Sequence, residues 1–263
     1  MPEAFTNSAL AWLVQLLLIT TRMSSMFILS PVLGRQSIPN AAKIGMSVLT
    51  AMMLINVVPP PEIYPFNNLP ALLAAVALEL LVGLVMGFGV ILFFNIVYTA
   101  GHVIDMQIGF SMAQVFDQTL GGQAPVAGSL LNLVLMLCFI STGGIPNLVN
   151  MLSRTFEVIP PGAAIFPAGI AYTALESFTT CFILSLNVSM PLIASALLAE
   201  IALGIIVRTA PQMNVFVIGI PIKVIIGLVM LVMTIPVFVT LTGNLFDMMY
   251  EAIDRLLLGM LPV

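Results

Sequence analysis

Long intervals without a charged residue constrain this chain most, because an apolar helix needs about 20 residues to cross roughly 30 Å of hydrocarbon. The longest interval, between Asp117 and Arg154, holds 36 uncharged residues. Five further intervals of 18 to 25 residues are interpreted as helical segments, and they follow Glu3, Lys43, Glu79, Glu176 and Lys223. We therefore expect an all-α chain with about six apolar segments, arranged as membrane-associated helical hairpins.

The overall composition excludes several classes of protein. Hydrophobic residues make up 60% of the chain and charged residues only 7%, whereas a soluble domain has about 25% charged residues. Such a chain has too few charges to form the surface of a soluble enzyme, and it is too apolar to be disordered. With 7 Lys and Arg against 11 Asp and Glu, it also lacks the basic charge that binding to nucleic acid requires.

No catalytic or metal-binding motif is present in the sequence. The single histidine, His102, and the two cysteines, Cys138 and Cys181, do not have the spacing of a zinc site. The patterns G-x-S-x-G and H-E-x-x-H are absent, and the glycine-rich GGQAPVAG lacks the lysine of a phosphate-binding loop. The sequence therefore predicts no enzyme activity, no cofactor and no metal ion.

Prolines within the apolar segments indicate kinked or broken helices. Pro191, Pro221 and Pro236 each remove a backbone donor and clash with the preceding turn. In hydrocarbon the freed carbonyl groups need partners from neighbouring protein. We therefore expect this chain to pack among partner proteins and not to be surrounded by lipid alone.

Three stripes of residues at helical spacing combine glycine with an ionisable group. Residues four apart share one face of a helix, and glycines at that spacing let two helices approach closely. The stripes are Glu79, Gly83 and Gly87; Gly101, Asp105 and Gly109; and Glu200, Gly204 and Arg208. The pattern predicts a buried acid at a tight helix seam. The acids would make interhelical hydrogen bonds or pair with Arg22, Arg208 or Lys223; the alternative is that they act as a relay for protons or ions.

Several stretches resemble FliR, the R subunit of the flagellar type III protein export gate, which is related to the SctT subunit of virulence injectisomes. In order along the chain they are RMSSMFILSPVLGRQSIPNAAKIG (22–45), ELLVGLVMGFG (79–89), AGHVIDMQIGFSMAQVFD (100–117) and RTAPQMNVFVIGIPIK (208–223). The resemblance spans nearly the whole chain.

The resemblance implies one copy of a single export-gate domain, 1–263, assembled with P-type and Q-type subunits. In that family the N-terminal part resembles a P subunit and the C-terminal part a Q subunit, which places the approximate halves here at 1–185 and 186–263. The assembly would form the channel that passes unfolded flagellar proteins across the bacterial inner membrane at the flagellar basal body. B-type and A-type export components are further expected partners.

The resemblance also implies a plug in the pore, which maps to residues 110–124. Bulky side chains are followed there by two glycines that could act as a hinge: the candidates are Phe110, Met112, Phe116, Gly121 and Gly122. From the residues alone, an ordinary interhelical loop whose aromatic side chains pack on neighbours explains this segment slightly better than a plug, and only the resemblance reverses this preference.

The stretch RTAPQMN predicts the end of a helix at Pro211, with Arg208 in the last turn, where a cation meets exposed carbonyl groups favourably. Gln212 and Asn214 would then satisfy backbone groups or contact partner subunits. The set of candidates for subunit packing also includes Pro221 and Lys223, which lie later in the chain.

Two alternatives remain open from the sequence. One is a purely structural scaffold that nucleates the other gate subunits and does not line the pore. The other belongs to a different class of protein. A proton-coupled secondary transporter would use Glu79, Asp105 and Glu200 as a proton relay, with broken helices forming a site near the middle of the membrane.

Overall fold

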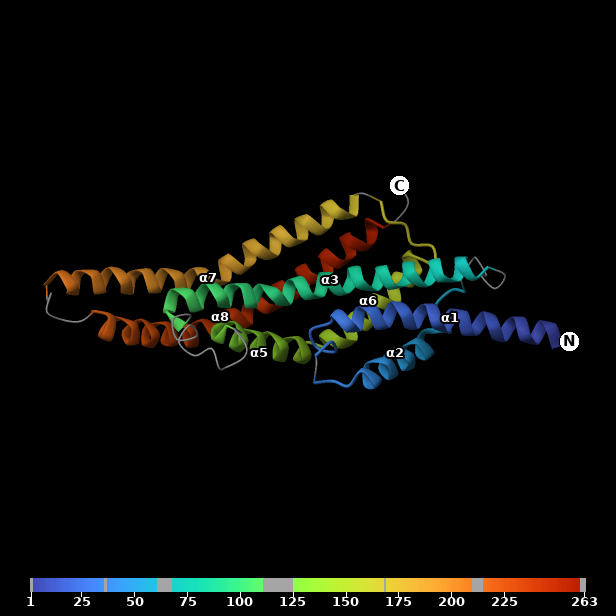
Figure 1. The fold of residues 1–263 in the computed structure, drawn as a ribbon, viewed down its shortest axis with the longest axis horizontal. Helices are drawn as coiled ribbons and strands as arrows, with labels where there is room; N and C mark the ends of the chain where they lie inside the picture. Colours follow the sequence, from blue (N-terminus) through green and yellow to red (C-terminus); the bar gives the residue numbers. More distant parts are fainter. Residues whose placement is uncertain are drawn as a thin grey trace. The chain divides into compact units, whose positions relative to one another are not determined.

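The computed structural model describes residues 2–35, 37–60, 68–110, 125–167, 169–209 and 215–260, without the side chains of 2–8 and 215–218. Within these ranges every regular element is a helix, which confirms the all-α prediction (Figure 1). The helices are α1 (Pro2–Leu29), α2 (Asn40–Leu54), α3 (Leu69–Ile108), α5 (Val126–Ser141), α6 (Gly144–Val158), α7 (Gly169–Thr209) and α8 (Val215–Leu258).

Three helices are much longer than the uncharged intervals that predicted them. Helices α3, α7 and α8 contain 40, 41 and 44 residues, and at 1.5 Å per residue each is about 60 Å long. The charged residues that bounded the intervals, such as Glu79 and Lys223, therefore lie inside helices. Four of the described helices are long and apolar enough to cross a membrane, and α5 with α6 gives a fifth candidate if that pair counts as one span.

The longest uncharged interval does not form one helix. It divides into α5 and α6, whose axes differ by 66°. The break falls at Gly143, which has a φ of +74° and precedes the first residue of α6. A left-handed conformation of this kind is readily adopted only by glycine. The glycine therefore divides an apolar stretch that the charge pattern alone would make one helix. Five of the six predicted segments correspond to single helices, α1, α2, α3, α7 and α8, and the sixth corresponds to α5 and α6 together.

The prolines within the apolar segments do not end the helices. Pro191 lies inside α7, and Pro221 and Pro236 lie inside α8. Figure 1 shows α7 changing direction about midway along its length, which is the usual effect of an interior proline. The predicted kinking is therefore compatible with the structure, but helix breaks at these positions were the wrong expectation. Helix α7 ends at Thr209 with Arg208 in its last turn, as the sequence indicated.

The chain divides into two compact units. Unit 1 contains Met1–Phe93, Gly143–Ser177 and Asp247–Val263, and unit 2 contains Phe94–Thr142 and Phe178–Phe246. Each unit combines segments from both of the predicted halves, 1–185 and 186–263. The likeness of those halves to P and Q subunits stays a prediction.

Glycines of α3 allow close helix packing in unit 1. A Cβ atom at Gly83 would meet Ser25 Oγ and the carbonyl oxygen of Arg22, and one at Gly87 would meet the Leu29 side chain. Helix α1 also packs against α2, and the side chain of Gln15 donates a hydrogen bond of 2.8 Å to the carbonyl oxygen of Val58. Because both of these α3 glycines face α1, this face of α3 forms a tight seam with α1.

Unit 2 is held by aromatic rings and by one contact between two backbones. Phe139 lies edge-on to both Phe94 and Phe246, with ring centroids 5.3 Å apart in each pair. Further along α3, a Cβ atom at Gly101 would meet the backbone of Gly128 in α5. Only the absence of a side chain allows α3 and α5 to approach this closely.

Candidate functional site

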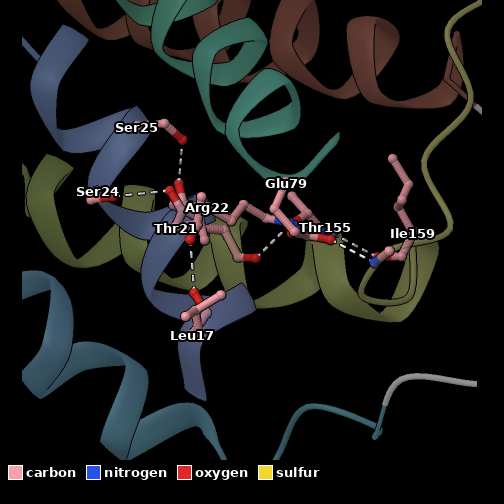
Figure 2. Close-up of polar contacts among 10 residues, drawn as sticks. Leu17, Thr21, Arg22, Ser24, Ser25, Glu79, Thr155 and Ile159 are labelled. Carbon is pink, nitrogen blue, oxygen red and sulfur yellow. Dashed lines mark hydrogen bonds and ion pairs between the residues drawn. The ribbon is translucent and has the colours of Figure 1, made fainter. Parts of the chain in front are cut away.

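The most buried charged group in unit 1 is an ion pair between α1 and α3. Arg22 donates from Nε to Glu79 Oε2 at 2.5 Å and from Nη2 to Glu79 Oε1 at 3.0 Å (Figure 2). Both side chains have an exposed fraction of 0%. This two-point geometry fixes the orientation of both groups as well as their separation. Pairing of Glu79 with Arg22 was one of the alternatives that the sequence left open.

Helix α6 and the turn after it complete the surroundings of this pair. Arg22 also donates to Thr155 Oγ1 at 3.0 Å and to the carbonyl oxygen of Ile159 at 3.1 Å. The backbone N–H of Gly162 donates to Glu79 Oε1 at 2.7 Å. The guanidinium carbon lies 4.0 Å from the centre of the Phe156 ring, a distance typical of a cation–π contact.

These contacts join three parts of unit 1 that are far apart in sequence. Burying a charged pair costs desolvation energy, which is recovered only when the geometry is good and further hydrogen bonds satisfy the remaining groups. Here both conditions hold, and no buried side-chain nitrogen or oxygen lacks a partner in the described part of the chain. We therefore interpret Arg22 and Glu79 as the polar centre that fixes α1, α3 and α6 to one another.

Asp105 has a different role, because it caps a helix. Its Oδ2 accepts a hydrogen bond of 2.6 Å from the N–H of Val126, and its Oδ1 accepts one of 3.1 Å from Ala127. These are the first two residues of α5, whose N-cap residue, Pro125, makes no side-chain capping bond. A carboxylate at a helix N-terminus satisfies free N–H groups and interacts favourably with the helix dipole. Asp105 thus holds the end of α3 against the start of α5.

Gly109, in the same stripe as Asp105, is not part of a helix seam. It follows the last residue of α3, its φ is +98°, and a Cβ atom there would have no described residue within 4 Å. Its N–H donates to the carbonyl oxygen of Asp105 at 3.0 Å. A glycine with positive φ at this position is a common way to end a helix, so the i+4 spacing here marks a helix end.

The third stripe lies on an exposed surface, which corrects the expectation of a buried seam. Glu200 accepts a hydrogen bond of 2.6 Å from Lys223, but its side chain is 54% exposed. A Cβ atom at Gly204 would have no neighbour within 4 Å in the described part of the chain, and Arg208 is exposed. Among the described residues, α8 contacts this face of α7 through Lys223, but no close approach of two backbones is found at Gly204. Packing of these residues against partner subunits stays a prediction.

The remaining candidates divide between described and undescribed residues. Pro221 is exposed and Lys223 and Phe110 are half-buried. The other candidates lie outside the described residues: Met112, Phe116, Gly121, Gly122, Pro211, Gln212 and Asn214.

Sequence reasoning missed the groups that complete the Arg22 site. Thr155, Phe156, Ile159 and Gly162 are separated from Arg22 by more than 130 positions, and ordinary residues of these types occur throughout the chain. The usable signal was Arg22 itself, a cation within an apolar segment, which requires polar partners. Among the described residues, no group of three or more His, Cys, Asp or Glu side chains could hold a metal ion.

Comparisons with known proteins match nearly the whole chain. A family model described as bacterial export proteins, family 1, matches residues 13–249. Flagellar biosynthetic protein FliR of Bacillus subtilis is 32% identical over 254 residues, which cover 95% of this chain and 97% of that protein. FliR of Escherichia coli is 26% identical over 251 residues, covering 95% of each chain. The secretion system apparatus protein SsaT of Salmonella typhimurium is 27% identical over 234 residues, covering 86% of this chain and 88% of that protein. Because the family model and these relatives extend over most of its length, the chain belongs to the FliR family of bacterial export proteins.

Proposed function

We propose that this chain is a subunit of the flagellar type III secretion export gate and passes unfolded flagellar proteins across the bacterial inner membrane. The observation that carries the proposal is the match to bacterial export proteins over residues 13–249. Relatives named as flagellar biosynthetic proteins, one of them 32% identical, support the flagellar system. Helices that are long and apolar enough to cross a membrane support a location in the membrane. We assign the chain no chemical step, with energy supplied by other components at the flagellar basal body.

The partners would be P-type and Q-type gate subunits, with B-type and A-type export components at the gate. The surface of the chain supports extensive packing against other proteins. In α7 and in α8, only 17% of the most apolar stretch of 18 residues is buried inside the protein, whereas the corresponding share in α3 is 61%. Such large exposed apolar surfaces mark contacts with lipid or with other protein. Exposed Arg208 and half-buried Lys223 give these surfaces charged positions for subunit contacts.

Purification of the tagged chain in a mild detergent from its native host, followed by native mass spectrometry, tests this proposal. We expect one copy of the chain bound to P-type and Q-type subunits. As a control, P-type and Q-type subunits should not co-purify with an unrelated inner-membrane protein that carries the same tag. A chain that is recovered alone or as a homo-oligomer would contradict the proposed assembly.

We also propose that residues 110–124 plug the channel. The flanking residues support this idea because Asp105 binds the first two residues of α5, so the two ends of the segment are held close together. A segment anchored at both ends could leave the channel without separating α3 from α5.

Deletion of residues 110–124 should therefore increase the permeability of the assembled gate to small molecules, because the proposed obstruction is removed. The measurement is release of a small dye from vesicles that contain the purified assembly. A second variant, Phe110→Ser with Met112→Ser and Phe116→Ser, keeps the length of the segment and removes only its bulk. Unchanged permeability in both variants, with the assembly intact, would exclude a plug made by these residues.

The transporter alternative gains no support from the acids that it requires. Glu79 is fully paired, Asp105 caps α5, and Glu200 pairs with Lys223 on an exposed surface. A relay needs acids that can exchange protons with one another, whereas each of these makes structural contacts. Loss of proton-driven solute uptake in a reconstituted Glu200→Gln variant would be needed to revive this alternative.

A further inference from the structure

One residue, Asp105, fixes the end of α3 and the start of α5 at the same place in unit 2. Its main-chain carbonyl oxygen accepts a hydrogen bond of 3.0 Å from the N–H of Gly109, which follows the last residue of α3. Its side chain accepts hydrogen bonds from the N–H groups of Val126 and Ala127, which begin α5. The chain therefore leaves α3 and enters α5 beside the same carboxylate.

The position of this carboxylate makes separation of the two helices costly. Asp105 is only 2% exposed, and Ala127 is fully buried. A buried polar group that loses its hydrogen-bond partners costs about 1–3 kcal/mol, and more when it is charged. Movement of α5 away from α3 would leave both the carboxylate and the first N–H groups of α5 without partners.

The glycine contact one turn before Asp105 fixes the position of α5 along α3. A Cβ atom at Gly101 would meet the Cα and N atoms of Gly128, and one at Gly128 would meet the Pro125 ring. A shift of α5 by one turn would bring Asn132, four residues after Gly128, opposite Gly101. No side chain fits at that point, so the two helices have one permitted register.

A third contact continues the same line of contacts. The Asn132 side chain donates a hydrogen bond of 3.1 Å to the Tyr98 hydroxyl group, and Asn132 is only 7% exposed. Tyr98, Gly101 and Asp105 are three and four positions apart, which places them on one face of α3. We call the contacts of these three residues with α5 the α3–α5 seam.

We propose that Asp105 is a positioning residue of the export gate and that the α3–α5 seam stays closed during export. The inference rests on the plug proposed above for residues 110–124, and it identifies the fixed base that holds the plug in place. The channel opens by movement of the segment between the two helices, and not by separation of α3 from α5.

Asp105→Ala provides the first test, with release of a small dye from vesicles that contain the purified assembly. We expect release to rise roughly tenfold, because α5 loses two hydrogen bonds to a charged group and the base of the plug is no longer fixed. Asp105→Asn keeps the shape of the side chain and one acceptor oxygen, so its effect should be smaller.

Gln15→Leu is the matched control, because it also removes a side chain that satisfies the end of a helix. Gln15 donates to the carbonyl oxygens of Ile55 at 3.3 Å and Val58 at 2.8 Å in unit 1. This variant should lower the thermal stability of the chain without raising dye release. The inference is overturned if Asp105→Ala releases no more dye than the unaltered assembly, or if Gln15→Leu releases as much as Asp105→Ala.

A second measurement uses the unaltered chain and so does not depend on how the variants fold. Hydrogen exchange of peptides that contain Val126 and Ala127 is compared between the empty assembly and an assembly in which an exported protein is arrested in the channel. We expect equally slow exchange in both, since a closed seam protects these N–H groups. Faster exchange in the loaded assembly would show that the seam opens and would overturn the inference.

Failure of this inference can be told apart from failure of the plug itself. If deletion of residues 110–124 raises dye release and Asp105→Ala does not, the plug stands and the role of Asp105 is rejected. If neither variant raises dye release, the plug is rejected together with the inference that rests on it.

Discussion

Arg22→Met should destabilise the folded chain by about 3–5 kcal/mol, the usual cost of removing one partner from a buried ion pair. The reason is that Glu79 would keep its charge in a site with no exposure to solvent and would retain only the hydrogen bond from Gly162. Thr155 and the carbonyl oxygen of Ile159 would also lose a donor. The measurement is the midpoint of thermal unfolding of the full chain in detergent, with circular dichroism as the signal.

Arg255→Met is the matched control for this variant. Arg255 is 62% exposed and lies 3.7 and 3.8 Å from its partners, so its loss should cost at most about 1 kcal/mol. The double variant Arg22→Met with Glu79→Leu should recover much of the lost stability, since it leaves no buried charge unpaired. Equal effects of Arg22→Met and Arg255→Met would contradict the assignment of Arg22 to the polar centre of unit 1.

Gly101→Ala should also destabilise the chain, by about 1–3 kcal/mol. A Cβ atom at Gly101 would overlap the backbone of Gly128, and backbone atoms cannot move aside as a flexible side chain can. The added methyl group would push α5 away from α3 and weaken the hydrogen bonds from Val126 and Ala127 to Asp105. Thermal unfolding measures the loss of stability, and hydrogen exchange at the first turn of α5 should rise.

Gly204→Ala provides a control with the same chemical change. Gly204 also lies inside a long helix, but a Cβ atom there would meet none of the residues that the structure describes within 4 Å. Because alanine favours helix over glycine by up to about 1 kcal/mol, this variant should be as stable as the unaltered chain or slightly more stable. If Gly204→Ala destabilised the isolated chain as much as Gly101→Ala, the close approach of α3 to α5 would not explain the effect.

Glycine spacing alone did not distinguish these sites. The stripes that contain Gly83, Gly101 and Gly204 have the same period of four, and each combines glycine with at least one ionisable residue. In the structure Gly83 and Gly101 face another helix, whereas a Cβ atom at Gly204 would meet no described residue within 4 Å. A period of four places residues on one face of a helix, but it does not say what lies opposite that face. That information comes from which helices pack together.

The sequence by itself determined the fold class, the membrane-type helices and the family. Apolar runs longer than a bilayer core and a nearly chargeless composition leave few other structures available. It also marked Arg22, Glu79 and Asp105 as groups that needed partners, because isolated charges are costly in an apolar setting. Only the tertiary structure decided what those partners are. Arg22 meets residues more than 130 positions away, and Asp105 binds backbone N–H groups that have no side-chain identity. Contacts of these kinds depend on how the helices pack in three dimensions, and a one-dimensional pattern does not record that packing.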